Sequence, residues 1–294
     1  PGFLARLFAS GKWKLTLDPR LSGRIRLRQE GDIELACLDI VSISASKALL
    51  WHSVEIRSRG RTDGLSGLTG EAAALLVADL HAFINTHLFG LIGAERGRLH
   101  DVDAQLRKIT EGSRQYLAQA DLGRAIASVP GDAAAALAHP LLNSQLMPAK
   151  LKASLPPSFT FLTDPGVRQA YNEAFVAAEL ETFGPFFDDL DGRSLSDQQR
   201  EACIRLEDNN LLVASAGSGK SATMVGKVAY VLEKQLYRPE EILLLAFNKS
   251  AADELKTRIA RQLQVGESEL ACRVTTFHAL GRGIIEEVEG RPPQ

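Results

Sequence analysis

The sequence predicts an α/β protein in which a β-rich N-terminal region and a helical middle region precede a C-terminal region with a parallel sheet. Three observations predict this class. Residues 12–68 contain short, often alternating apolar runs, and residues 95–180 carry apolar residues at helical spacing. From about residue 195, short apolar runs alternate with helical patterns. Such alternation is typical of a parallel sheet covered by helices.

The composition is that of an ordinary globular protein. The 294 residues are enough for about two domains, and 45% of them are hydrophobic. A net charge of −2 excludes a polycation, so any contact with nucleic acid must come from local patches. The three cysteines form no CxxC pair, which favours a reducing, cytoplasmic setting over a disulfide scaffold or a zinc ribbon. The apolar run ILLLAF at 242–247 is too short to span a bilayer, and no membrane association is expected.

Residues 1–90 are predicted to form a small β-rich domain. Six short strand-like runs over 12–68 are broken by Gly, Asp and Ser, and residues 69–88 are then expected to form an amphipathic helix. Residues 1–61 hold 11 Lys or Arg against 6 Asp or Glu. Arginines alternate along two of the predicted strands, at positions 24, 26 and 28 and at positions 57, 59 and 61. They form either a stripe that faces phosphates or the solvated outer face of a sheet.

Residues 91–190 are predicted to be a helical connector. Leu99, Val102 and Leu106 begin a coiled-coil-like stripe of fewer than three heptads, which indicates a helical hairpin more than a long dimer. A last helix is expected to start near Asp164, which can cap it.

Residues 191–294 are predicted to alternate strand, loop, helix, strand and helix. NLLVA at 210–214 is expected to be a strand that enters a glycine-rich loop. A helix over 220–236, a strand at ILLLAF and a second helix over about 250–263 follow, and RVTTFHALGRGII adds a further strand and helix. This predicts part of a parallel sheet.

The loop at 214–221 carries the pattern of a phosphate-binding loop. It reads ASAGSGKS, and only its first position, Ala214, departs from G-x-x-x-x-G-K-[ST]. The backbone N–H groups of Ala216, Gly217, Ser218 and Gly219 are expected to turn toward one point at a helix N-terminus, where they bind the phosphates of a nucleotide. Lys220 adds a positive charge near the β- and γ-phosphates, and the Ser221 hydroxyl is a ligand for Mg²⁺. The alternative is a glycine-rich turn without a ligand.

Three segments that flank the loop indicate the class of nucleotide-dependent protein. They are LSDQQREA at 195–202, LLLAFNKSAADELKTRI at 243–259 and TTFHALGRGII at 275–285. In this order they resemble the first motor domain of superfamily 1 helicases of the UvrD/Rep type. The resemblance implies a RecA-like domain that binds ATP and Mg²⁺. Gln199 would read adenine, because its amide both donates and accepts hydrogen bonds, and Arg258 would reach the phosphates.

The same resemblance implies contact with single-stranded or partly duplex DNA. Six residues fall in the motifs concerned: Phe247, Asn248, Lys249, Thr276, Phe277 and His278. Amides, hydroxyls and a positive charge hold phosphates, and aromatic rings support bases. Taken singly, Phe277 could be a core aromatic, His278 a structural histidine and Lys249 a solvated side chain. Two departures are Ser196, where the family has Asn, and Ala222, where it often has Arg.

Two longer segments resemble the bacterial helicase IV family. These are SKALLWHSVEIRSRG and RQAYNEAFVAAELETFGPFFDDLDGRSLSDQQ. The resemblance implies a pleckstrin-homology-like domain over 1–90, a helical connector over 91–190 and the first part of a RecA-like domain over 191–294. It also implies 3′–5′ polarity and a role in DNA repair.

One part of such a motor is missing from the sequence. The family needs an Asp-Glu pair at a strand end and arginines from a second RecA-like domain. Asp253-Glu254, the one Asp-Glu pair after the loop, falls inside a predicted helix. The chain is therefore expected to be the N-terminal part of a helicase that does not hydrolyse ATP alone. Two alternatives are an ATP-driven remodeller that binds RNA polymerase or another protein through its N-terminal region, and a nucleotide- or DNA-binding module without catalysis.

Overall fold

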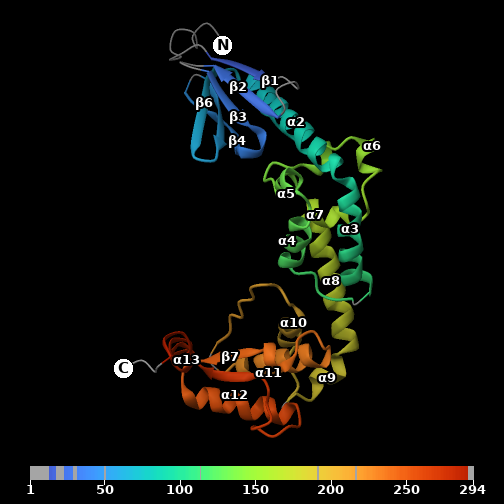
Figure 1. Ribbon diagram of the computed structural model, residues 1–294, viewed down its shortest axis with the longest axis vertical. Helices are drawn as coiled ribbons and strands as arrows, with labels where there is room; N and C mark the ends of the chain where they lie inside the picture. Colours follow the sequence, from blue (N-terminus) through green and yellow to red (C-terminus); the bar gives the residue numbers. More distant parts are fainter. Residues whose placement is uncertain are drawn as a thin grey trace. The chain divides into compact units, whose positions relative to one another are not determined.

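The computed structural model describes residues 13–17, 23–28, 32–49, 51–112, 114–190, 192–215 and 217–290, which divide into two compact units (Figure 1). One unit comprises Pro1–Arg114 and Gln119–Gln169, and the other comprises Gln115–Ala118 and Ala170–Gln294. The residues of each unit contact mainly other residues of the same unit.

The first unit opens with two antiparallel sheets of three strands each. The first sheet has the order β1 (Lys14–Leu17), β2 (Arg24–Arg28), β3 (Asp32–Ala36). After a short 3₁₀ turn, η2 (Cys37–Asp39), the second sheet has the order β4 (Ile40–Lys47), β5 (His52–Ser58), β6 (Arg61–Leu68). All six predicted strands are confirmed.

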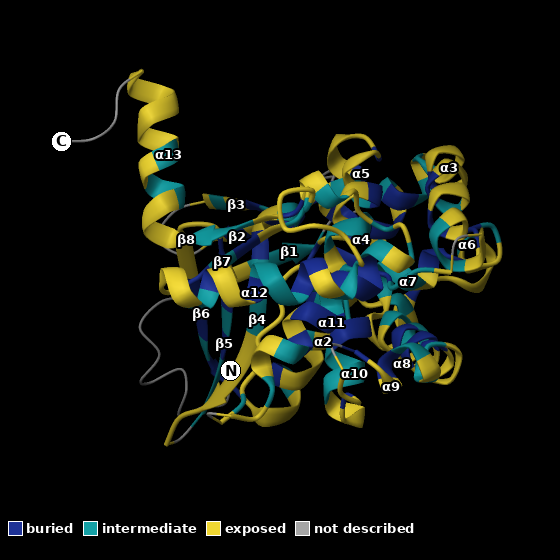
Figure 2. Cartoon of the chain, turned by 90° about the horizontal axis from the view of Figure 1, so that it is seen from below, coloured by how far each residue is buried: buried dark blue, intermediate teal, exposed yellow. Residues whose placement is uncertain are grey.

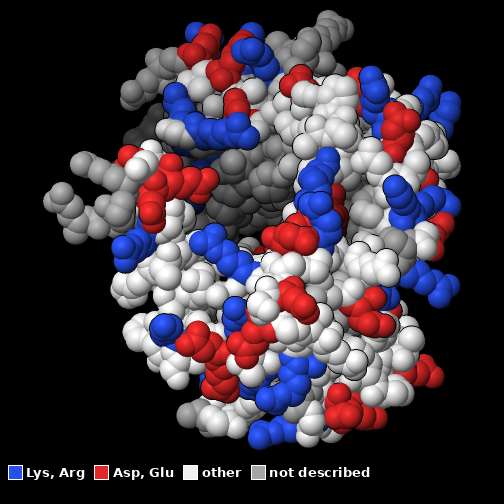
Figure 3. Space-filling view, turned by 60° about the horizontal axis from the view of Figure 1, so that its bottom comes forward, with Lys and Arg blue, Asp and Glu red and all other residues white. Residues whose placement is uncertain are grey.

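The arginines of β2 lie on its exposed face and are paired with carboxylates of β3. Ile25 and Leu27 of the same strand are fully buried, as period-two alternation requires. Glu34 accepts from Arg24 at 3.4 Å and from Arg26 at 2.6 Å. These cross-strand pairs favour a solvated outer sheet face over a stripe that faces phosphates. On the face seen in Figure 3, basic and acidic side chains are likewise interspersed.

A long apolar helix, α2 (Gly70–Ala94), packs on β4, β5 and β6. Thr69 caps it, since its hydroxyl accepts from the backbone N–H of Ala72. Its buried side includes Leu80, Ile84 and Leu88. By length and composition alone α2 could also cross a membrane, a property that the sequence analysis, based on ILLLAF, overlooked.

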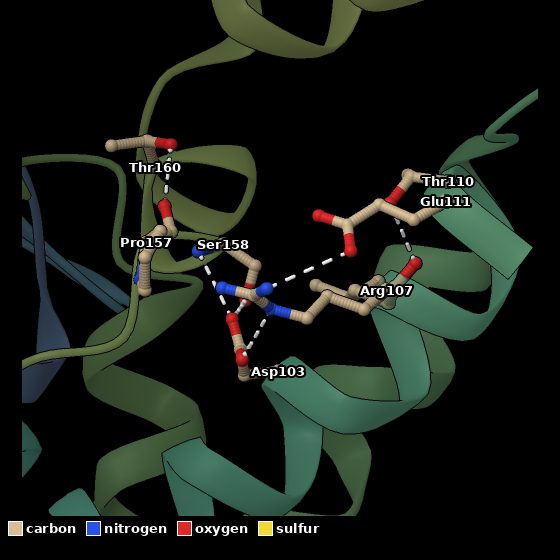
Figure 4. A network of polar contacts seen from close by, with 8 residues as sticks. Asp103, Arg107, Thr110, Glu111, Pro157, Ser158 and Thr160 are labelled. Carbon is tan, nitrogen blue, oxygen red and sulfur yellow. Dashed lines mark hydrogen bonds and ion pairs between the residues drawn. The ribbon is translucent and has the colours of Figure 1, made fainter.

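Short helices complete the first unit. They are α3 (Arg96–Arg107), which continues as one π-helical turn η3 (Lys108–Gly112), α4 (Gln119–Ala127), α5 (Gly131–Leu137), the 3₁₀ turn η4 (Ser144–Leu146), α6 (Ala149–Lys152) and α7 (Phe159–Thr163). Leu99, Val102 and Leu106 of α3 are buried within the unit, so the predicted stripe packs in a helical assembly. Asp103 of α3 accepts hydrogen bonds from Ser158 at the start of α7 (Figure 4).

The second unit contains the predicted α/β pattern. Helix α8 (Pro165–Thr182) belongs to this unit from residue 170 onward. It is followed by α9 (Gly184–Asp188), α10 (Asp197–Ile204), α11 (Lys220–Glu233), the 3₁₀ turn η5 (Pro239–Glu241), β7 (Leu243–Ala246), α12 (Lys249–Gln262), β8 (Arg273–Thr276) and α13 (Phe277–Glu289). Strands β7 and β8 pair in parallel, with Ala246 opposite Thr276. The buried core includes Phe187, Tyr230 and Ile259. The parallel pairing is confirmed, whereas α13 buries none of its side chains (Figure 2).

The predicted strand at 210–214 is wrong. This segment has no strand conformation, and the side chains of Leu211 and Val213 are 89% and 84% exposed. Among the described residues, the only strands of this sheet are β7 and β8, and they pair with each other. An apolar run of this kind becomes a buried strand only where a neighbouring strand pairs with its backbone N–H and C=O groups.

Candidate nucleotide and nucleic-acid site

The glycine-rich loop makes a tight turn directly before α11. Gly217 and Gly219 have φ angles of +76° and +89°, in the left-handed region that favours glycine. A Cβ atom on Gly219 would also lie 2.5 Å from Nε2 of Gln199. The sequence therefore places glycine where the backbone turns and where a neighbouring segment approaches it closely. Ala216 lies outside the described residues.

Lys220 begins α11 and lies over the loop. Its ammonium donates to the carbonyl oxygens of Ala214 at 2.8 Å and Ser215 at 2.6 Å. The Ser218 hydroxyl donates to the same Ser215 carbonyl at 2.7 Å. The ammonium and the N-terminus of a 14-residue helix thus lie together at an exposed turn, and both favour an anion. Ser221, in the first turn of α11, is exposed, so its hydroxyl is accessible to a cation.

Gln199 lies beside this loop although 19 residues separate it from Ser218. Its Nε2 donates to the Ser218 carbonyl at 2.8 Å. Its Oε1 accepts from the backbone N–H of Ser196 at 2.9 Å, while the Ser196 hydroxyl accepts from the Gln199 N–H in return. This capping box fixes the N-terminus of α10. The structure therefore brings Gln199, Ser218 and Lys220 to one place.

Arg200 is a residue of this region that the sequence analysis missed. Its guanidinium donates to the Leu195 carbonyl at 2.7 Å, to Ser194 at 2.8 Å and to Asp188 at 2.6 Å. It thereby ties the start of α10 to the segment that precedes it. The signal available in the sequence was its place next to Gln199 in LSDQQREA.

Lys227 was missed as well. Its ammonium donates to the carbonyls of Ala202 at 3.1 Å and Arg205 at 2.6 Å, at the C-terminal end of α10. Burial lowers the pKa of Lys227, and the nearby Cys203 partly opposes this effect. No local sequence pattern identifies such a lysine, because the carbonyls that it contacts belong to another helix.

The second group of predicted residues lies where β7 and β8 end. Phe247 and Phe277 directly follow the paired residues Ala246 and Thr276, and their side chains are 85% and 60% exposed. Exposed aromatic rings at neighbouring strand ends are a feature that core packing does not explain. Lys249 and His278 are exposed beside them.

Two of these residues cap helices. Asn248 Oδ1 accepts from the N–H of Ala251 at 2.8 Å, and Thr276 Oγ1 accepts from the N–H of Ala279 at 3.1 Å. The caps start α12 and α13 at the edge where the rings are exposed.

Arg258 lies on α12, which packs beside α11. Its guanidinium is 3.4 Å from the carboxylate of Glu254, one turn earlier, and its side chain is 17% exposed.

This part of the chain is similar to a known family. Residues 195–290 match the UvrD/REP helicase N-terminal domain. The matched segment begins just before α10 and ends after α13, so it includes both groups of residues described above. The sequence resemblance to UvrD/Rep-type helicases is confirmed.

Individual proteins that are similar to part of this chain are DNA helicases by name. DNA helicase IV of Escherichia coli is 34% identical over 126 residues, which cover 43% of this chain and 18% of that protein. DNA helicase II of Salmonella typhimurium is 36% identical over 92 residues, or 31% of this chain and 12% of that protein. ATP-dependent DNA helicase Rep of Buchnera aphidicola is 33% identical over 94 residues, or 32% and 14%. The chain spans less than a fifth of the length of each of these relatives.

Proposed function

We propose that this chain is the N-terminal part of an ATP-dependent 3′–5′ DNA helicase of the helicase IV type. The observation that carries this proposal is the hydrogen bond between the Gln199 amide and the Ser218 carbonyl, within the loop that Lys220 closes. In a UvrD/REP-like segment, it puts a group suited to adenine beside a group suited to phosphates. The polarity and a role in DNA repair rest on the resemblance alone.

The residues of the loop fit Mg²⁺-ATP by their chemistry. The backbone around Gly217 and Gly219, together with the Lys220 ammonium, would hold the β- and γ-phosphates. The exposed Ser221 hydroxyl would be a ligand for Mg²⁺, which neutralises phosphate charge when bound. Ala216 would complete the loop and Arg258 would approach the phosphates.

The exposed ends of β7 and β8 would hold single-stranded DNA. Phe247 and Phe277 offer rings on which bases stack, and Lys249 and His278 lie beside them for backbone phosphates. Asn248 and Thr276 would act mainly through the helix N-termini that they cap.

The chain is proposed to bind ATP without hydrolysing it. Asp253-Glu254 lies in the middle of α12 and not at a strand end, so it does not supply the metal-bound carboxylate and the general base of such a motor. The proposed organisation is a pleckstrin-homology-like domain over 1–90, a helical connector over 91–190 and a partial RecA-like domain over 191–294, in a cytoplasmic protein.

The proposal is tested by nucleotide binding to the Lys220→Ala chain. We expect this substitution to weaken Mg²⁺-ATP binding roughly 100-fold, because it removes a charge-assisted contact with phosphate. Titration calorimetry at fixed ionic strength measures this change. Lys150→Ala, which removes an exposed lysine from α6, is the matched control and should bind as the unaltered chain does. Equal affinity in the two variants would refute the assignment of the loop.

A further inference from the structure

Helix α10 packs against α11 at a point where α11 has no side chain. Gly226 is buried, and a Cβ atom there would lie 2.8 Å from Cδ1 of Leu195 and 3.0 Å from Sγ of Cys203. Both neighbours are themselves buried, so they have little room to move. The two helices can approach this closely only because residue 226 is glycine.

Polar contacts join the same two helices on either side of Gly226. Cys203 Sγ donates to the Thr223 carbonyl of α11 at 3.4 Å. Lys227 donates to the carbonyls of Ala202, in the last turn of α10, and of Arg205, which directly follows α10. The last carbonyls of a helix need such partners from outside it. The position of α10 along and across α11 is thus fixed by packing and by hydrogen bonds together.

The position of α10 determines where the Gln199 amide lies. Gln199 is the third residue of α10, and α11 begins at the loop that its amide contacts. One amide hydrogen is donated to Ser218 and one lone pair of Oε1 accepts from Ser196. The amide therefore retains one donor and one acceptor. Adenine offers a matching acceptor and donor at N7 and the 6-amino group, whereas guanine offers two acceptors there.

We propose that Gly226 and Lys227 are positioning residues that set the preference of the site for adenine nucleotides. This inference rests on the proposed function, since it assumes that Gln199 reads the base. A shift of α10 would move the amide relative to the loop, and hydrogen bonds weaken steeply with misalignment. The phosphate cradle belongs to the loop and to α11, so it would be left in place.

The test compares three probes on two variants. Gly226→Ala adds the methyl group for which there is no room, and Lys227→Met keeps the alkyl chain but removes the ammonium. Affinities are measured for Mg²⁺-ATP, Mg²⁺-GTP and inorganic tripolyphosphate, which has no base. We expect the unaltered chain to prefer ATP, and each variant to lose about tenfold of that preference, while tripolyphosphate binding changes less than about twofold.

Gly281→Ala in α13 is the matched control, because a Cβ atom there meets nothing within 4 Å. It should keep the full preference for ATP. Circular dichroism shows whether each variant is folded. If Gly226→Ala does not fold, Lys227→Met alone tests the positioning role. Full preference for ATP in a folded variant would overturn the positioning role and leave the proposed function standing. An unaltered chain that binds ATP and GTP equally would overturn the role of Gln199, and the positioning role with it.

Discussion

Asp103 shows how a single carboxylate joins two helices of the first unit. Its Oδ1 accepts from the backbone N–H of Ser158 at 3.2 Å and from the Ser158 hydroxyl at 2.5 Å, and its Oδ2 accepts from Arg107 at 2.8 Å (Figure 4). Burial opposes the charge of this carboxyl, but the hydrogen bonds from Ser158 and Arg107 outweigh that effect and lower the pKa of Asp103. The carboxylate therefore stabilises the start of α7 while it is ionised.

We expect Asp103→Asn to lower the free energy of unfolding by about 1–2 kcal/mol at pH 7, since the hydrogen bonds to a charged acceptor are lost. Because the folded pKa lies below the unfolded value, this contribution is fully present above about pH 4 and is lost as the pH falls through the folded pKa. Urea unfolding at pH 7 and at lower pH measures it. Asp101→Asn, whose carboxylate is largely exposed, is the control. A difference between Asp103→Asn and the unaltered chain that persists undiminished in acid would contradict this account.

Helices α12 and α13 begin at the same edge of the sheet because each follows one of its two parallel strands. Because β7 and β8 are parallel and in register, the residues that follow them emerge side by side. Each helix begins at a side-chain cap at this edge, Asn248 for α12 and Thr276 for α13. Phe247 precedes its cap and Phe277 is the first residue of α13, and both residues are exposed. The element that presents the rings is therefore a pair of strand ends.

We expect Phe247→Ala and Phe277→Ala each to weaken the binding of a single-stranded oligothymidylate roughly 5- to 100-fold, the loss of one stacked base. Fluorescence anisotropy at one fixed salt concentration measures the affinity. Tyr237→Ala is the matched control, because it removes another exposed aromatic ring from the same unit. If all three variants bind alike, the strand ends are not the DNA site.

At the scale of the whole molecule, the described residues provide two separate cores. The first unit packs α2 on the sheet of β4 to β6 and α5 on α2, and the second packs α8 to α12 around a two-stranded parallel sheet. This sheet has two strands among the described residues. Leu211 and Val213, which precede the loop, and Val288 of α13 are exposed. The residues proposed to bind nucleotide and DNA lie in the second unit.

We expect the 294-residue chain to bind Mg²⁺-ATP and to show no ATP turnover above background, with or without single-stranded DNA. Loss of one transition-state arginine alone costs phosphoryl-transfer enzymes about 10³- to 10⁵-fold in rate, and the chain is proposed to lack the general base as well. Phosphate release measures the rate. Turnover stimulated by DNA would show that this chain supplies its own catalytic groups and would overturn the proposal of an inactive fragment.

The sequence by itself determined most of the helices and strands and the turn before α11. Period-two alternation in GRIRLR and helical spacing after Thr69 depend on neighbours along the chain, and they predict β2 and α2 correctly. The glycines of ASAGSGKS likewise predict the turn that precedes α11. The presence of Gln199 beside the loop was also predictable, but only through the family resemblance, because 19 residues separate it from Ser218.

Only the tertiary structure decided which apolar and charged residues find partners. The run LLVA has the composition of a buried strand but lies exposed, because strand conformation depends on backbone partners from elsewhere in the fold. Arg24 and Arg26 are paired across strands with Glu34, and Gly226 and Lys227 acquire their importance from α10 packing on α11. The physical reason is the same in each case: hydrogen bonds and close packing act between segments that are distant in the sequence, and a local pattern contains no information about which segments will meet.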